Sequence, residues 1–440
     1  MKGAEEQLLE FFRNGHKPCT DTRALNPGDV FFALKGDNFN GNHFATRALE
    51  MGAAMVVVDE ELPMADNRIL RVNDVMQFLQ NASKAHRQQF AIPFIGITGT
   101  NGKTTTKELV SAVLGSQFST LSTSGNLNNH IGVPVTLLNL QESHQMAVIE
   151  IGANQIGDVE FLSSVCDPDF GLITNVGKAH LQGFGSPENI VKAKTELYRH
   201  LIGKQGTIFV NGGNRVLIEK ARETPVVYYG SGNSNHLQGS IIATDARLSF
   251  SFKVLKPFGN AKVQMQGTVH SKLVGDYNLE NFLAAVSIGL YFGITPENVV
   301  NALESYTPAN HRSQLVETGL NTVILDAYNA NPTSMGLALN NLEAMAGSKK
   351  AAILGDMLEL GKASYQEHER VLEQMIRLNL DVKIVVGSEF CKAAIGLKQI
   401  QAFESADEAR HFLKNNKICN HVILVKGSRG IMMERVVEYL

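Results

Sequence analysis

Short apolar runs alternate with helical patterns along almost the whole of this 440-residue chain. The first two runs, DVFFAL and AAMVVVD, occupy residues 29–34 and 53–59. Between them FATRALEMG has helical spacing and ends in a helix-stopping glycine, and a polar helical pattern covers residues 74–90. Short buried strands that alternate with helices are typical of a parallel sheet, so the pattern predicts an α/β fold.

A second series of strands begins with FIGIT at residue 94. Further apolar runs lie at residues 146–152, 170–177, 207–212 and 226–230. Residues 240–274 then alternate polar and apolar positions, which predicts antiparallel strands, and a helix is predicted over residues 275–293.

Beyond YTPANHR, four more apolar runs are each followed by a helical pattern. They lie at residues 321–328, 349–356, 382–387 and 420–427. The pattern therefore predicts three domains: a small α/β domain at 1–91, a central parallel-sheet domain at 92–308 and a C-terminal Rossmann-like α/β domain at 309–440.

Composition narrows the class of protein. Hydrophobic residues make up 44% of the chain, charged residues 19%, and the formal net charge is -3, so no basic field indicates nucleic acid as a partner. No run of about 18 apolar residues predicts a membrane span, and the acidic, amphipathic start lacks the features of a signal peptide. Four scattered cysteines without metal-ligand spacing predict reduced thiols in the core of a cytoplasmic protein.

A phosphate-binding loop joins the FIGIT strand to the next helix, in the sequence GITGTNGKTTTK. Glycines let backbone N–H groups surround an anion, Lys103 reaches the outer phosphates, and the Thr104 hydroxyl can hold Mg²⁺. The general phosphate-loop pattern would place glycine at position 97, where this chain has Ile97. The loop predicts a nucleoside triphosphate site built from Gly99, Thr100, Asn101, Gly102, Lys103, Thr104 and Thr105.

The string GTNGKTT is similar to the phosphate loop of the Mur ligase family. The resemblance covers essentially the whole chain. It implies an enzyme that uses ATP to join an amino acid or peptide to a carboxylate, through an acyl-phosphate. It also implies ATP and Mg²⁺ as cofactors. We expect a monomer, although the sequence does not assign the oligomeric state.

Glu150, His180 and Lys194 lie near the ends of predicted strands or in a following helix. From the residues alone, a strand-end glutamate facing solvent, a structural histidine and an unmodified surface lysine stay open as alternatives. The family resemblance implies that all three bind Mg²⁺ together with Thr104. In that reading Lys194 is a carbamyl-lysine, because CO₂ converts its cationic amine into an anionic oxygen ligand. Lys103, Arg312, His180 and Lys194 are then the catalytic residues.

Four residues outside the phosphate loop are candidates for contacts with the nucleotide. Arg312 can bind the γ-phosphate in a bidentate manner, Asp326 can accept hydrogen bonds from ribose, and Asn329 can pair with an adenine edge. Asn278 resembles a nucleotide-contacting asparagine of the family. Structural roles for Arg312 and Asn278 stay open.

Two segments resemble substrate-binding parts of the family. Residues 21–44 resemble the UDP-sugar-binding domain of the later members of the pathway, and STSGNLNNHIGVP at 122–134 resembles the acceptor-binding segment of the members that add D-alanyl-D-alanine. The D-N-P-R string of the lysine- or diaminopimelate-adding members is absent. The resemblance implies contacts to the UDP-substrate from Thr22, Arg23, Lys35, Gly36, Asn126, Asn128 and Asn129.

The implied reaction joins D-alanyl-D-alanine to UDP-N-acetylmuramoyl-tripeptide with release of ADP and phosphate, a step of peptidoglycan synthesis. Two alternatives stay open: a family member that adds another amino acid, such as lysine or diaminopimelate, and a binding module that only hydrolyses ATP. The sequence does not assign the third residue of the acceptor peptide. It also does not choose among Asp356, Glu359 and His368 as the group that deprotonates the incoming amine.

Overall fold

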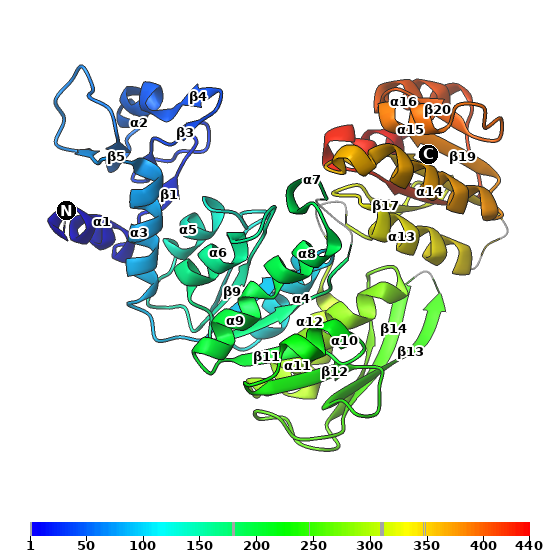
Figure 1. Ribbon diagram of the computed structural model, residues 1–440, viewed down its shortest axis with the longest axis horizontal. Coiled ribbons are helices and arrows are strands. Elements are labelled where there is room, and N and C mark those ends of the chain that lie inside the picture. Colours follow the sequence, from blue (N-terminus) through cyan, green and yellow to red (C-terminus); the bar gives the residue numbers. More distant parts are fainter. Residues whose placement is uncertain (1, 178–180, 246, 309–311, 346, 348) are drawn as a thin grey trace.

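The computed structural model describes residues 2–177, 181–245, 247–308, 312–345, 347 and 349–440, which form three α/β units in chain order (Figure 1). The N-terminal unit has a parallel sheet of order β1-β2-β5-β6 and a separate β3–β4 hairpin. Its elements are α1 (Lys2–Arg13), β1 (Pro18–Cys19), β2 (Val30–Phe32), β3 (Lys35–Gly36), β4 (Phe39–Asn40), α2 (Ala45–Glu50), β5 (Met55–Val58), β6 (Ile69–Arg71) and α3 (Val75–Arg87).

The central unit is built on a sheet of order β15-β14-β13-β12-β11-β10-β7-β9-β8. Its first elements are β7 (Phe94–Thr98), α4 (Lys103–Gly115), β8 (Thr120–Ser122), α5 (Gly132–Leu137), β9 (Met146–Glu150), α6 (Asp158–Cys166), β10 (Phe170–Ile173), α7 (Leu181–Phe184), α8 (Pro187–Lys194) and α9 (Glu196–Gly203). They are followed by β11 (Thr207–Asn211), α10 (Arg215–Lys220), β12 (Val226–Gly230), β13 (Leu237–Asp245), β14 (Arg247–Val254), β15 (Gln266–His270), α11 (Leu279–Tyr291) and α12 (Pro296–Ser305). β14 lies between β13 and β15 and is antiparallel to both, in line with the antiparallel strands that the alternating pattern predicted.

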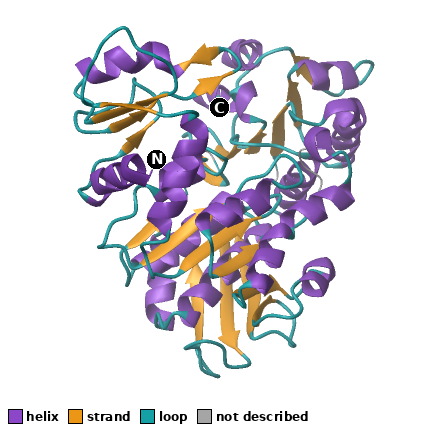
Figure 2. Cartoon of the chain, turned by 60° about the vertical axis from the view of Figure 1, so that its left-hand side comes forward, coloured by secondary structure: helices purple, strands orange, loops and turns teal. Residues whose placement is uncertain are grey.

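Helices cover both faces of this central sheet (Figure 2). Successive residues of β7 point to opposite faces: Ile95 and Ile97 join the core under α4 and α11, and Phe94 joins the core under α6 and α9. A strand buried on both faces reads as a continuous apolar run, which explains why FIGIT carries no polar alternation. The phosphate loop therefore starts from a strand whose two faces are both buried.

The C-terminal unit has a six-stranded sheet of order β16-β17-β21-β18-β19-β20, parallel except for the edge strand β16. Its elements are β16 (Gln314–Glu317), β17 (Thr322–Asp326), α13 (Pro332–Ala344), β18 (Lys350–Gly355), α14 (Ser364–Arg377), β19 (Val382–Val386), α15 (Ser388–Ala393), β20 (Gln401–Phe403), α16 (Ala406–Asn415) and β21 (Val422–Lys426). The last strand of the chain lies between the first and second parallel strands. The carboxyl ends of β17 and β21 are therefore neighbours.

The N-terminal unit is fixed to the central unit by apolar and polar contacts. Leu8, Phe12 and Leu79 share one core with Leu138, which follows α5. The buried Arg87 of α3 donates from Nε to the Cys166 carbonyl at 2.9 Å. The N-terminal and C-terminal units lie at opposite ends of the molecule in Figure 1, with the central unit between them.

Two sequence-based expectations need correction. The helix expected over residues 275–293 is shorter: α11 spans Leu279–Tyr291 and follows a 3₁₀ turn at Asp276–Asn278. Gly275 stays outside the helix, because its φ of 96° does not fit one. The four thiols are free, but only Cys19 and Cys166 are buried in the core; Cys391 is half-buried and Cys419 is exposed. Among the described residues, no helix is both long and apolar enough to cross a membrane. The three-unit α/β class is as predicted.

Candidate active site

The phosphate loop turns sharply between β7 and α4 at two glycines. Gly99 and Gly102 have φ angles of 142° and 78°, which side chains disfavour. A Cβ on Gly102 would lie 2.7 Å from Oδ1 of Asn281 on α11. No side chain caps the start of α4, so its N–H groups remain available for an anion. Backbone conformation favours glycine at both positions, and the close contact with Asn281 favours it further at Gly102.

Lys103 is folded back onto its own loop. Its Nζ donates to the carbonyls of Gly99 at 2.9 Å and Thr100 at 3.1 Å. Burial is the main cause that lowers the pKa of Lys103, and the positive charge of Arg312 lowers this pKa further, whereas Glu150 opposes the shift. A cation held in a desolvated loop interacts strongly with a phosphate that enters it.

Two residues that the sequence analysis missed hold the loop from β10. Asn175 accepts from the Asn101 N–H and donates to the Asn101 carbonyl, both at 3.0 Å. Thr174 also donates to that carbonyl, at 2.6 Å. The available signal was their position in TNVG, directly after a strand parallel to β7.

Glu150 lies at the end of β9 and is 1% exposed. Its Oε1 accepts a hydrogen bond from Nδ2 of Asn128 at 2.7 Å. Its Oε2 is buried and has no hydrogen-bond partner among the described residues. An uncompensated buried carboxylate oxygen is costly, so Glu150 together with the buried hydroxyl of Thr104 fits a bound cation.

Lys194 ends α8 and is 2% exposed. Burial, and after it the positive charge of Lys103, holds the pKa of Lys194 well below its usual range, although nearby carboxylates oppose the shift. His180 lies outside the described residues. In the part of the chain that the structure describes, no group of three or more His, Cys, Asp or Glu side chains forms a metal site.

A cleft of about 470 Å³ opens between the phosphate loop and the C-terminal unit. Most of the predicted site residues line it: Thr100, Asn101, Gly102, Lys103, Thr104, Thr105, Asn126, Asn128, Asn129, Glu150, Asn278, Arg312, Asp326 and Asn329. Lys426, a residue that sequence reasoning missed, lines it as well. The candidate site thus lies at the carboxyl ends of parallel strands, as expected for open α/β sheets.

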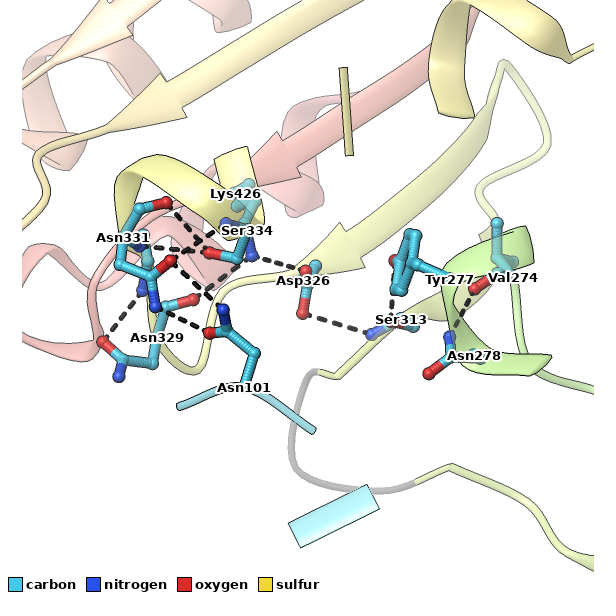
Figure 3. A network of polar contacts seen from close by, with 11 residues as sticks. Asn101, Val274, Tyr277, Asn278, Ser313, Asp326, Asn329, Asn331, Ser334 and Lys426 are labelled. Atoms are coloured by element: carbon cyan, nitrogen blue, oxygen red, sulfur yellow. Dashed lines mark hydrogen bonds and ion pairs between the residues drawn. The ribbon is translucent and has the colours of Figure 1, made fainter. Parts of the chain in front are cut away.

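The C-terminal wall of the cleft carries a polar network (Figure 3). Lys426 donates to Oδ2 of Asp326 at 2.5 Å and to the Asn329 carbonyl at 3.2 Å. The Arg312 guanidinium lies 3.6 Å from the centre of the Tyr328 ring, and its Nε is buried without a partner among the described residues. An unpaired guanidinium nitrogen next to the phosphate loop suits an anionic ligand.

Other predicted residues are engaged within the fold. Asn278 donates to the Val274 carbonyl at 2.8 Å and accepts from Asn281 at 2.9 Å, so both ends of its amide are occupied. Asn129 accepts from the N–H groups of Ile131 and Gly132, which shapes the turn into α5. These two side chains line the cleft but already have structural partners.

The predicted UDP-binding residues of the N-terminal unit do not line the cleft. Arg23 is paired with Asp21 at 2.6 Å. Lys35 contacts both Asp59 and Glu60 at 2.9 Å. Thr22 is buried, and Gly36 lies in the β3–β4 hairpin.

The three candidate bases differ in their surroundings. Asp356 accepts from the N–H groups of Glu389 and Phe390 at the start of α15, and burial raises its pKa. His368 is fully buried; its Nε2 accepts from the Met357 N–H at 3.0 Å and its Nδ1 donates to the Ser364 carbonyl at 2.7 Å. Asp356 and His368 are therefore structural, whereas Glu359 lines the cleft.

With this geometry in place, comparison with known proteins assigns the family. The models for the Mur ligase family catalytic domain, the Mur ligase middle domain and the Mur ligase glutamate ligase domain match residues 16–87, 97–289 and 311–429. The chain belongs to the Mur ligase family.

A known ligase sequence and two solved structures are similar to the chain over nearly its full length. The UDP-N-acetylmuramoyl-tripeptide–D-alanyl-D-alanine ligase of Bacillus subtilis (strain 168) is 34% identical, over 97% of this chain and 93% of the relative. The crystal structure of MurF from Acinetobacter baumannii superposes with a TM-score of 0.85 at 32% identity, covering 98% of this chain and 97% of that one. MurF from Thermotoga maritima in complex with ADP gives a TM-score of 0.84 at 26% identity, with 98% and 97% coverage.

Proposed function

We propose that the chain is a MurF-type ligase that uses ATP to join D-alanyl-D-alanine to UDP-N-acetylmuramoyl-tripeptide, a step of peptidoglycan synthesis. The terminal carboxylate of the tripeptide attacks the γ-phosphate of ATP and ADP leaves. The amine of the dipeptide then attacks the acyl-phosphate, phosphate leaves, and an amide bond remains. The near full-length similarity to D-alanyl-D-alanine-adding ligases supports this reading over a lysine- or diaminopimelate-adding enzyme.

The observation that carries the proposal is the shared cleft. Its floor is a phosphate loop with a buried lysine, and its opposite wall contains Arg312 and Asp326 of the C-terminal unit. In such a cleft the triphosphate would lie between two cationic side chains, Lys103 and Arg312. Both stabilise the negative charge that develops as the phosphoryl group is transferred. A site enclosed by two units also keeps water from the acyl-phosphate.

For the magnesium site we propose Thr104, Glu150, His180 and Lys194 as ligands. The unpartnered Oε2 of Glu150 and the buried Thr104 hydroxyl support this assignment. When bound, Mg²⁺ would offset the repulsion between the substrate carboxylate and the triphosphate.

Lys194 enters the set as a carbamyl-lysine. Only the neutral amine reacts with CO₂, and a lysine 2% exposed with its pKa well below the usual range favours that form. The product is a carboxylate-like group, so the charge at this position changes from repelling a metal ion to attracting one.

For the nucleotide we propose that Asp326 accepts from the ribose hydroxyls and Asn329 pairs with adenine, while Asn278 holds the start of α11. For the UDP-substrate we propose Thr22, Arg23, Lys35 and Gly36 in the N-terminal unit. The GNLNN segment, whose Asn126, Asn128 and Asn129 line the cleft, would contact the sugar and peptide.

Three further proposals concern the oligomeric state, the location in the cell and the domain boundaries. Both walls of the cleft come from one chain, which supports a monomer as the active form. ATP and a UDP-linked substrate are cytoplasmic metabolites, so we place the enzyme in the cytoplasm. We also propose domain boundaries near residues 91 and 308, which the three separate family matches support.

The test is phosphate release measured with every combination of ATP, UDP-N-acetylmuramoyl-tripeptide and dipeptide. The expected result is release only when all three are present, with a pentapeptide product of the corresponding mass. D-Alanyl-D-alanine should be replaced by neither lysine nor diaminopimelate. Lys103→Ala should lose phosphate release while keeping affinity for the UDP-substrate. Equal release without any acceptor would instead identify a module that only hydrolyses ATP.

A further inference from the structure

The segment between β17 and α13 carries several of the residues on the C-terminal side of the cleft. It runs from Asp326 to Asn331, and we call it the β17–α13 loop. Asp326 and Asn329 line the cleft, and Tyr328 lies under the Arg312 guanidinium at 3.6 Å. The residues that hold this loop in place therefore determine where Asp326 and Asn329 lie in the cleft.

One end of the loop is held by Lys426, which is 1% exposed at the end of β21. Its Nζ bridges Oδ2 of Asp326 at 2.5 Å and the Asn329 carbonyl at 3.2 Å (Figure 3). The two acceptors are three residues apart, so one ammonium group fixes the curvature of the loop. Hydrogen bonds to a buried charged group are among the stronger ones in proteins.

The other end of the loop is joined to the phosphate loop. Asn331 is 6% exposed and caps α13 by accepting from the Ser334 N–H at 2.9 Å. Its Nδ2 donates to Oδ1 of Asn101 at 2.6 Å, although the two residues are 230 positions apart (Figure 3). The main chain of Asn101 is itself fixed by Thr174 and Asn175. The amide pair thus connects two rigid elements of different units.

We propose that Lys426 and Asn331 are positioning residues for the nucleotide. Together they hold the β17–α13 loop at a set distance from the phosphate loop, so that phosphates and nucleoside are bound by two prearranged surfaces. This inference rests on the proposed function, because the ligand it concerns is the nucleotide of that reaction. Prearrangement strengthens binding because less ordering is required when the ligand arrives.

Two variants test the two ends of the loop. Lys426→Met removes the ammonium group and keeps an apolar stem of similar length. Asn331→Ser keeps a good helix cap but is too short to reach Asn101, so the fold should be retained. Matched controls are Lys383→Met on β19, whose Nζ donates to the Leu380 carbonyl, and Asn214→Ser, which caps α10; neither residue lines the cleft.

Binding of ADP and of inorganic tripolyphosphate to the full-length protein is measured by calorimetry. Each variant should bind ADP about tenfold to a hundredfold more weakly, as for loss of one charge-assisted or buried hydrogen bond. Tripolyphosphate has no nucleoside and would contact only the phosphate loop and Arg312, so its affinity should fall clearly less than the affinity for ADP. In steady-state assays the KM for ATP should rise while the KM for the UDP-substrate stays constant.

The possible results distinguish a failure of the positioning role from a failure of the proposed function. Wild-type affinity for ADP in Asn331→Ser overturns the positioning role, and it does so even if Lys426→Met does not fold. An equal loss of ADP and tripolyphosphate binding also overturns it, because the phosphate loop itself would then be damaged. If the unaltered protein binds neither ligand, the proposed function fails instead.

Discussion

Nδ2 of Asn128 donates to Oε1 of Glu150 at 2.7 Å, while Oε2 of the same carboxylate has no partner among the described residues. Asn128 belongs to the GNLNN segment, which the sequence associates with the acceptor substrate. The contact gives Asn128 a second role, because it fixes one oxygen of Glu150 and leaves the other for a ligand in the cleft. The GNLNN segment is therefore joined by this hydrogen bond to a carboxylate of the proposed magnesium site.

From this contact we expect Asn128→Ala to weaken magnesium binding by about 10- to 100-fold, the usual effect of losing a partner of a metal ligand. The measurement is the Mg²⁺ dependence of phosphate release. Asn126→Ala is the control, since Asn126 lines the same cleft from an exposed position and, among the described residues, no hydrogen bond joins it to Glu150. An unchanged Mg²⁺ dependence in Asn128→Ala would show that Glu150 is not a metal ligand.

Lys194→Ala should lose activity by about 100-fold or more, because the proposed carbamate would supply one oxygen ligand of the metal. Added acetate should restore part of the activity by supplying a carboxylate in the space that the side chain leaves. Independently, the unaltered enzyme should lose activity in CO₂-depleted buffer and regain it with bicarbonate. Full activity of the variant without acetate would exclude the carbamate.

Gly102→Ala should weaken nucleotide binding at least about tenfold and destabilise the protein by about 1–3 kcal/mol. The reasons are the φ of 78° and the 2.7 Å approach of a Cβ to Asn281. Calorimetry with ADP and thermal unfolding measure both effects. Gly115→Ala at the other end of α4 is the control, since a Cβ there meets no atom within 4 Å. Nucleotide binding of wild-type strength in Gly102→Ala would contradict the assignment of this loop as the phosphate site.

His86 gives the contact between the N-terminal and central units a predicted pH dependence. The ring is fully buried near Phe12 and Phe90, and its Nε2 contacts the Leu140 carbonyl at 3.1 Å. Burial lowers the pKa of His86 from 6.5, and the charge of Arg13 lowers it further. The unfolded chain therefore binds the proton first as the pH falls below 6.5, and the free energy of unfolding decreases through that window.

Denaturant unfolding at several pH values measures this effect. Replacing the ring by an uncharged amide in His86→Gln should flatten the pH dependence between pH 6.5 and the lower folded-state pKa. The exposed His411 serves as the control, and His411→Gln should leave the curve unchanged. Identical slopes for wild type and His86→Gln would contradict the prediction.

The local pattern of apolar and polar residues was sufficient to predict many of the buried strands. The buried strands β7, β9, β17 and β18 are continuous apolar runs, and hydrophobic periodicity depends only on which faces of an element are covered. Short, less apolar elements such as β1, β6 and the edge strand β16 were missed, because pairing with a neighbour rather than local pattern stabilises them.

The sequence by itself determined the chemistry of the phosphate loop, since glycines, lysine and threonine at fixed spacing between a strand and a helix leave few other structures open. Only the tertiary structure decided which distant residues complete the site. Lys426 reaches Asp326 because β21 inserts beside β17, and Asn331 meets Asn101 because two units face one cleft. Spacing along the chain carries no information on such contacts; the order of strands in the sheet and the packing of the units create them.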